Sequence, residues 1–178
     1  MNVLISAHFD LSHPVMSIKM DDKKIDGLVD NFAGVFTAYQ VSRKTGIPVY
    51  FTNFEELEFD GAIDVAKSLP KDDTLVIVID TILEDDANGK KAVIANTYGI
   101  SVEPLKEKLQ EHVHFINGFF EEEEDETWIY GHEFGLKTFY FGIPIPNDYH
   151  DVNNNVALQV IDEATEILLQ IISNLNNS

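Results

Sequence analysis

The 178-residue sequence contains no cysteine, which excludes disulfide bridges and thiolate metal sites. It also lacks any apolar run close to the roughly 20 residues that a membrane helix needs. Its first residues show neither the basic residues nor the long apolar stretch of a secretory signal. We therefore expect a cytoplasmic protein that does not insert into a membrane.

Basic residues are scarce, with 12 lysines and arginines against 31 acidic residues and a formal net charge of −19. A surface of this charge repels phosphate backbones, so we expect no nucleic-acid partner. The charge favours solubility, and it would attract cationic substrates such as peptides with a free amino terminus. The apolar fraction of 44% suffices for one core at this length, which predicts a single domain over residues 1–178.

Strand-like and helix-like apolar segments alternate along the chain, which predicts a three-layer α/β/α fold with a mainly parallel, mixed central sheet. We expect strands over residues 2–7, 49–54, 74–79, 91–96 and 138–143. Helices are expected over residues 31–44, 61–69, 102–113 and 154–172. Between these elements, residues 115–130 are predicted to form short strands around a solvated acidic loop over residues 121–126.

Histidines and carboxylates follow four of the predicted strands. They are His8 and Asp10, then Glu55 and Glu56, then Asp80, and finally His150. Asp30 opens the helix predicted over residues 31–44, where the positive end of the helix would hold its carboxylate. Because ligands bind beyond the carboxyl ends of parallel strands, we expect these side chains to meet at one rim of the sheet.

This mixture of side chains points to a metal site. Imidazole and carboxylate together suit zinc, manganese or cobalt, whereas calcium and magnesium prefer oxygen alone. One carboxylate can bridge two ions about 3.5–4 Å apart, and such a pair activates a water and polarises a carbonyl group. We therefore predict a hydrolase site with two divalent ions, zinc first and cobalt or manganese as alternatives. Asp10 shares a strand face with His8 and would fix the tautomer of its ring.

Each of these residues also has an ordinary structural explanation when it is taken alone. The Glu55–Glu56 pair suits an exposed surface, Asp30 suits a helix N-cap, and Asp80 suits a turn. The metal-site prediction therefore depends on the whole ordered set rather than on any one residue.

The ordered set resembles the co-catalytic zinc aminopeptidases and their aminoacylase-like relatives, a group that includes glutamyl and tetrahedral aminopeptidases. The matching segments are Ser6–Asp10, Gly27–Asn31, Thr52–Glu56, Val78–Asp80 and Tyr149–Asp151. The resemblance implies five metal ligands, with one ion on His8 and Asp80, the other on Glu56 and His150, and Asp30 between them. It also implies that Glu55 is the general base for the attacking water.

The resemblance implies an exopeptidase of the aminopeptidase type, acting on a peptide or small amide. Two alternatives stay open. The same site would suit a deacylase of N-acyl amino acids or related amides. The chain between His8 and Asp30 is also too short for the lid or dimerisation domain that many relatives carry. A catalytically silent relative that binds metal or a protein partner is therefore the third hypothesis, and a homo-oligomer is left open.

Overall fold

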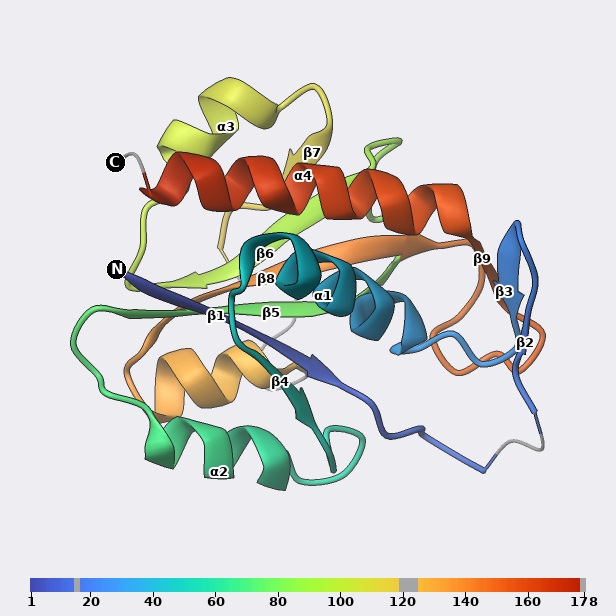
Figure 1. The fold of residues 1–178 in the computed structure, drawn as a ribbon, viewed down its shortest axis with the longest axis horizontal. Helices are drawn as coiled ribbons and strands as arrows, with labels where there is room; N and C mark the ends of the chain where they lie inside the picture. Colours follow the sequence, from blue (N-terminus) through green and yellow to red (C-terminus); the bar gives the residue numbers. More distant parts are fainter. Residues whose placement is uncertain (15–16, 119–124, 177–178) are drawn as a thin grey trace.

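The structure, a computed structural model, describes residues 1–14, 17–118 and 125–176 (Figure 1). The strands are β1 (Asn2–His8), β2 (Lys19–Met20), β3 (Lys24–Asp26), β4 (Val49–Thr52), β5 (Thr74–Leu83), β6 (Ala92–Tyr98), β7 (Val113–Phe115), β8 (Lys137–Ile145) and β9 (Asn155–Ala157). The helices are α1 (Phe32–Thr45), α2 (Asp60–Ser68), α3 (Glu103–Leu109), the π-helix η1 (Trp128–Glu133) and α4 (Leu158–Asn176). None of these helices is both long enough and apolar enough to cross a membrane.

The central sheet has six strands in the order β4-β1-β5-β8-β6-β7. The first four run parallel, β6 runs antiparallel to β8, and β7 runs parallel to β6. The strands β2, β3 and β9 form a separate antiparallel sheet. The prediction of a mainly parallel, mixed central sheet is thus confirmed.

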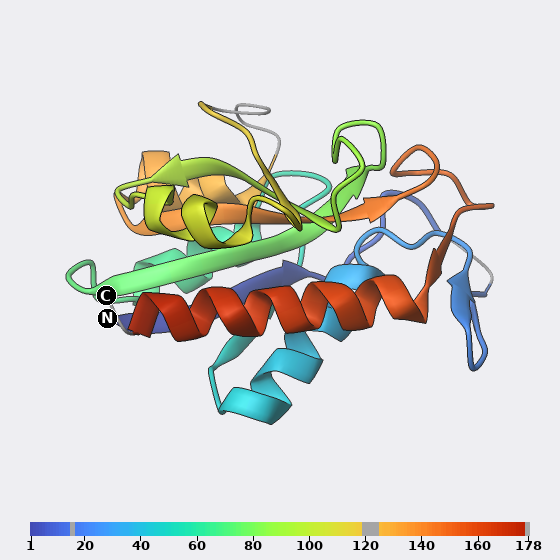
Figure 2. The same cartoon turned by 90° about the horizontal axis from the view of Figure 1, so that it is seen from above.

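Helices cover both faces of the central sheet, which gives the predicted α/β layers (Figures 1 and 2). Alternate residues of β5 enter different cores, since Ile77 packs with the cluster that includes α1 and α4, while Val78 packs with α2 and η1. A strand buried on both faces explains the continuous apolar run over residues 75–79.

Several element boundaries differ from the prediction. The strand β5 continues to Leu83, so Asp80 lies within it, and β4 ends two residues earlier than expected, at Thr52. The helix expected over residues 102–113 ends at Leu109, and the closing helix begins at Leu158 rather than at residue 154. The prediction of short strands over residues 115–130 is wrong where the structure describes this segment. Phe115 is the last residue of β7, no other described residue of the segment belongs to a strand, and the π-helix η1 begins at Trp128.

The start of α1 is fixed by Asn31 rather than by Asp30. Its side-chain oxygen accepts a hydrogen bond from the Gly34 N–H at 2.9 Å, and its amide donates to the Ile79 carbonyl at 2.7 Å. A Cβ on Gly34 would lie 2.1 Å from that oxygen, so glycine is needed for the cap to close. This arrangement ties the amino end of α1 to β5 and leaves the Asp30 carboxylate free for another role.

Candidate metal centre

The first part of the site lies on two neighbouring strands. His8 ends β1 and Asp80 lies on β5, which pairs in parallel with β1. His8 Nε2 lies 3.3 Å from Asp80 Oδ1, 3.4 Å from Asp30 Oδ1 and 4.0 Å from Glu55 Oε2. The His8 side chain is 2% exposed. The structure therefore places one buried imidazole nitrogen among three carboxylates.

Asp10 connects this histidine to the turn that carries the two glutamates. Its Oδ1 lies 3.5 Å from His8 Nδ1, the nitrogen that faces away from Asp80. Its two oxygens also accept hydrogen bonds from the N–H groups of Glu55 and Glu56, each at 3.3 Å. Asp10 therefore lies beside the His8 ring, two residues beyond the end of β1, and it also holds the position of the glutamates.

The second part of the site is more exposed. His150 Nε2 lies 3.1 Å from Glu56 Oε2, and the His150 side chain is 50% exposed. The His150 ring also meets the His13 ring edge-on, with 6.4 Å between centroids. Asp30 Oδ1 accepts a hydrogen bond from the Thr81 hydroxyl at 3.0 Å. Thr81 was not predicted for the site, because the strand was expected to end at residue 79 and β5 continues to Leu83.

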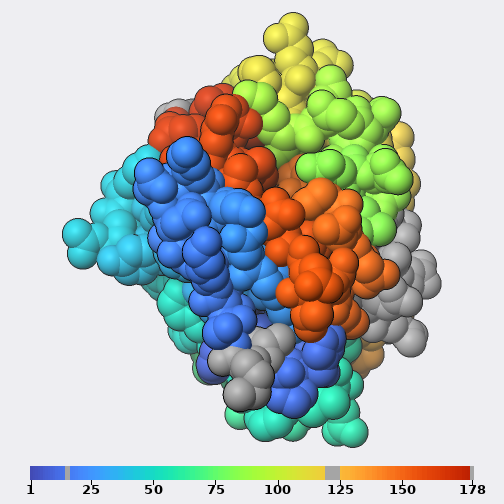
Figure 3. Space-filling view, turned by 90° about the vertical axis from the view of Figure 1, so that its right-hand side faces the viewer, coloured from blue at the N-terminus to red at the C-terminus, as the bar shows by residue number. Residues whose placement is uncertain are grey.

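These residues form three overlapping groups. Within each group, every residue offers one side-chain nitrogen or oxygen atom, and these atoms lie within 4.8 Å of one another. The groups are His8–Asp30–Asp80, His8–Glu55–Glu56 and Asp30–Glu56–His150. The first and third share Asp30. The structure thus brings together every side chain that the sequence proposed for the site. The end of the molecule toward which β1 points in Figure 1 faces the viewer in Figure 3, where the β2–β3 segment (blue) lies beside the segment after β8 (orange).

Burial and mutual repulsion shift the pKa values of the cluster. Burial raises the pKa of Asp80 to about 8, and Asp30 adds to the shift. Burial and the charge of Asp80 raise the pKa of Glu55 to about 10. Burial would lower the pKa of His8, but the carboxylates of Asp80, Asp10 and Asp30 together raise it well above its usual value. Without a metal ion, the His8 imidazolium therefore supplies the positive charge among these carboxylates.

The residues fit divalent ions on chemical grounds. Glu56 Oε1 is buried and has no hydrogen-bond partner among the described residues. In the described part of the chain, no lysine or arginine forms an ion pair with the clustered carboxylates. The lysines that do form ion pairs there pair with acidic residues outside the cluster. A mixed set of imidazole and carboxylate ligands suits zinc, cobalt or manganese.

These shifts predict that the metal-free protein loses stability as the pH rises. In the unfolded chain, Asp80 and Glu55 have pKa values near 3.8 and 4.5, so both have released their protons by about pH 5 to 8. In the folded chain, the raised pKa values keep these protons bound over the same range. Since the folded state then binds more protons, the free energy of unfolding should fall across this range, by about 2 kcal/mol or more. His8 contributes with the same sign, since its folded pKa is also raised.

Urea denaturation in excess chelator, repeated at several pH values, measures this effect. Asp80→Asn is the matched variant, and its stability should depend less steeply on pH. Added zinc should oppose the fall, because the ion binds the deprotonated ligands. A metal-free stability that stays level or rises from pH 5 to 8 would contradict the assigned protonation states.

Glu126 corrects the prediction that residues 121–126 form a solvated loop. Residues 121–124 lie outside the described residues, but Asp125 and Glu126 are buried, at 6% and 2% exposure. The Ser6 hydroxyl donates a hydrogen bond to Glu126 Oε2 at 2.5 Å and lies 3.0 Å from the Tyr130 hydroxyl. Burial raises the pKa of Glu126. Nothing in the acidic run distinguishes its last glutamate from its neighbours, so the sequence offered no signal for this burial.

Glu126→Gln should destabilise the fold less than Glu126→Ala, because glutamine keeps the size of the side chain and an oxygen that can accept from the Ser6 hydroxyl. Glu126→Ala should destabilise the fold by about 2–4 kcal/mol, since it opens a cavity and removes one of the two partners of the Ser6 hydroxyl. Urea denaturation of both variants near pH 6 checks this difference. Equal losses for glutamine and alanine would mean that Glu126 is held as a charged group.

Comparisons with known proteins agree with this fold. No protein-family model and no curated protein matches the sequence. Among solved structures, an aminopeptidase from the archaeon Desulfurococcus kamchatkensis matches with a TM-score of 0.59 at 17% identity, over 85% of this chain and 49% of that one. A TET aminopeptidase from Thaumarchaeota archaeon SCGC AB-539-E09 matches with a TM-score of 0.59 at 18% identity, over 88% and 51%.

A third match is the TET1 peptidase of Pyrococcus horikoshii, described as assembling into a tetrahedron or a large octahedral shell. Its TM-score is 0.55 at 15% identity, over 85% of this chain and 51% of that one. The chain therefore has an α/β fold similar to that of aminopeptidases, and it spans about half the length of these proteins.

Proposed function

We propose that this chain is a metal-dependent amide hydrolase of the aminopeptidase type. The observation that carries the proposal is the pair of ligand groups sharing Asp30, with Glu55 beside them. One divalent ion would be held by His8 and Asp80, the other by Glu56 and His150, and Asp30 would contact both. Ions bound there would supply the Lewis acidity that polarises a substrate carbonyl group.

Glu55 is the proposed proton carrier. Its pKa near 10 reflects burial first and then the negative charge of Asp80, and positive charge brought into the cluster would lower that value toward neutrality. Glu55 then takes a proton from the attacking water and later passes it to the leaving amine. Asp10 orients the His8 ring and, through the N–H groups of Glu55 and Glu56, keeps the glutamate turn in place.

The substrate class follows from charge and from the structural neighbours. Two of the matching structures described above are aminopeptidases. The formal charge of −19 favours substrates that carry a positive charge, such as the free amino group of a peptide. We infer zinc as the first choice of metal, a cytoplasmic setting, and self-association like that of the shell-forming neighbour.

A substrate panel tests this proposal. The purified chain, loaded separately with zinc, cobalt or manganese, is offered aminoacyl nitroanilides, the same compounds with acetylated amino groups, and N-acetyl amino acids. We expect cleavage of the anilides with a free amino group and little reaction with the blocked ones. Cleavage of N-acetyl amino acids instead would assign a deacylase. Two bound ions with no cleavage would favour the catalytically silent alternative.

A further inference from the structure

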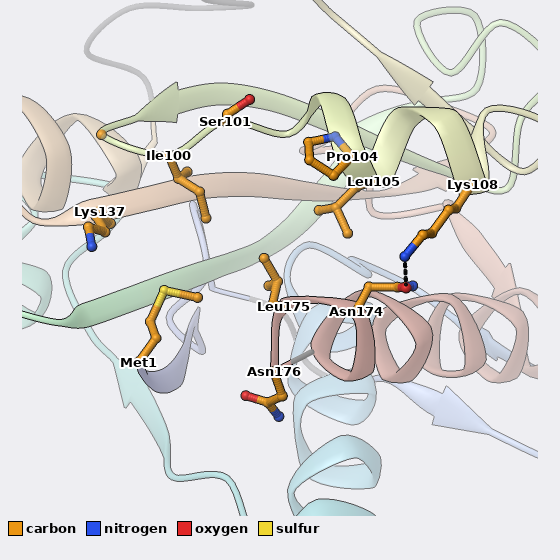
Figure 4. A pocket seen from close by; sticks show the side chains of 11 residues that line it. Met1, Ile100, Ser101, Pro104, Leu105, Lys108, Lys137, Asn174, Leu175 and Asn176 are labelled. Carbon is orange, nitrogen blue, oxygen red and sulfur yellow. Dashed lines mark hydrogen bonds between the residues drawn. The ribbon is translucent and has the colours of Figure 1, made fainter. Parts of the chain in front are cut away.

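A cavity of about 470 Å³ lies beside the helices α3 and α4 (Figure 4). Its wall includes Met1, which precedes β1, Lys137, which begins β8, and Ile100, which follows the antiparallel strand β6. These positions lie at the end of the sheet where the parallel strands begin. His8 is the last residue of β1 and therefore lies at the opposite end of these strands. The cavity is therefore separate from the site described above.

The wall of this cavity is mostly apolar. Pro104 and Leu105 come from α3, Leu175 comes from the last turn of α4, and Ile100 joins them from the connection after β6. Figure 4 shows Leu105 and Leu175 facing each other between α3 and α4, with Ile100 to one side of them. A volume of about 470 Å³ falls within the range of small-molecule pockets, which is about 300–1,000 Å³.

Two lysines give the cavity a positive charge, which is unusual in a chain with a net charge of −19. Lys108 Nζ donates a hydrogen bond to Asn174 Oδ1 at 2.7 Å, and Lys137 lines the other side of the cavity. Neither lysine forms an ion pair with an acidic residue in the parts of the chain that the structure describes. Six of the other nine lysines there do form such pairs, namely Lys19, Lys24, Lys44, Lys67, Lys91 and Lys106.

We propose that this cavity binds a small aliphatic carboxylate, with the hydrocarbon chain against the apolar wall and the carboxylate beside Lys108. The charge complementarity selects an anion over a neutral apolar molecule. A carboxylate is favoured over a phosphate because the wall contains no arginine, whose planar fork suits phosphate. Binding here would not involve the metal centre, so the cavity would serve a ligand other than the substrate.

Methyl NMR on the full chain tests the proposal, with octanoate and octanol as probes below their aggregation range. Octanoate should shift the methyl signals of Ile100, Leu105 and Leu175 in a saturable manner, and octanol should bind about tenfold more weakly. Lys108→Gln should weaken octanoate binding about fivefold, and Lys137→Gln, at the other side of the cavity, should weaken it less. Lys67→Gln, an exposed lysine on α2 that is paired with Asp64, is the matched control and should change nothing.

Several outcomes would overturn the proposal. These are no saturable shift with octanoate, equal affinity for octanoate and octanol, or wild-type affinity in Lys108→Gln. Octanoate shifts centred on other methyl groups would also overturn it. Asp80→Asn should retain octanoate binding, because the cavity lies at the opposite end of the sheet from Asp80. Loss of binding in that variant would contradict the separation of the two sites.

Discussion

Glu55→Gln is expected to lower kcat/KM for amide hydrolysis by about a thousandfold or more while leaving the metal content close to that of the wild type. Glutamine keeps the size of the side chain but cannot take a proton from the attacking water. Glu55 Oε2 lies 4.0 Å from His8 Nε2, beside the proposed ligands, so the substitution should disturb their positions little. Steady-state kinetics on the best substrate of the panel and metal analysis of the same preparation measure the two effects.

Glu58→Gln is the matched control, because Glu58 follows the same pair of glutamates and is exposed. It should retain both activity and metal. Retained turnover in Glu55→Gln would remove Glu55 from the role of general base. Loss of metal together with activity would instead mean that Glu55 is a metal ligand. Such a role is compatible with the ligand group that Glu55 forms with His8 and Glu56.

Asp30→Asn is expected to reduce the metal content from about two ions per chain to nearly none, with loss of hydrolysis. Asp30 belongs both to the group with His8 and Asp80 and to the group with Glu56 and His150, so its carboxylate would stabilise both ions. Asparagine can still accept the hydrogen bond from Thr81, so the fold should survive the substitution. Inductively coupled plasma mass spectrometry after dialysis against a low excess of zinc gives the stoichiometry, and circular dichroism checks the fold.

Two variants sharpen the Asp30 experiment. His150→Gln removes a ligand from one group only and should leave about one ion per chain. Asp22→Asn changes an exposed carboxylate outside the cluster and should leave both ions bound. Full metal content in Asp30→Asn, or loss of both ions in His150→Gln, would mean that the two groups do not share Asp30 as proposed.

The residues of the candidate site could be predicted because their positions follow from strand order. His8, Glu55 and Asp80 lie at or near the carboxyl ends of parallel strands that the apolar runs indicated, and such ends meet at one edge of a sheet. The partner of Asp30 could not be predicted in the same way. Thr81 donates to it because β5 continues past Asp80 to Leu83, and the sequence gives no clear end to a β-branched run.

The elements that were missed are stabilised by contacts between distant segments. The strands β2 and β3 are only two and three residues long and carry charged residues, so no local pattern indicates them. The closing helix was expected from residue 154 because the apolar pattern extends back to there. Asn155–Ala157 instead pairs with β3, so α4 begins only at Leu158. Val113–Phe115 likewise pairs with β6, which ends the predicted helix early.

The most direct test of the two-metal site is anomalous X-ray diffraction from crystals of the wild-type chain grown with zinc, with data on both sides of the zinc edge. We expect two peaks about 3.5–4 Å apart on either side of the Asp30 carboxylate, one beside His8 and Asp80 and the other beside Glu56 and His150. Absence of zinc from this cluster, or a single ion that leaves Asp30 without a metal contact, would contradict the two-metal site.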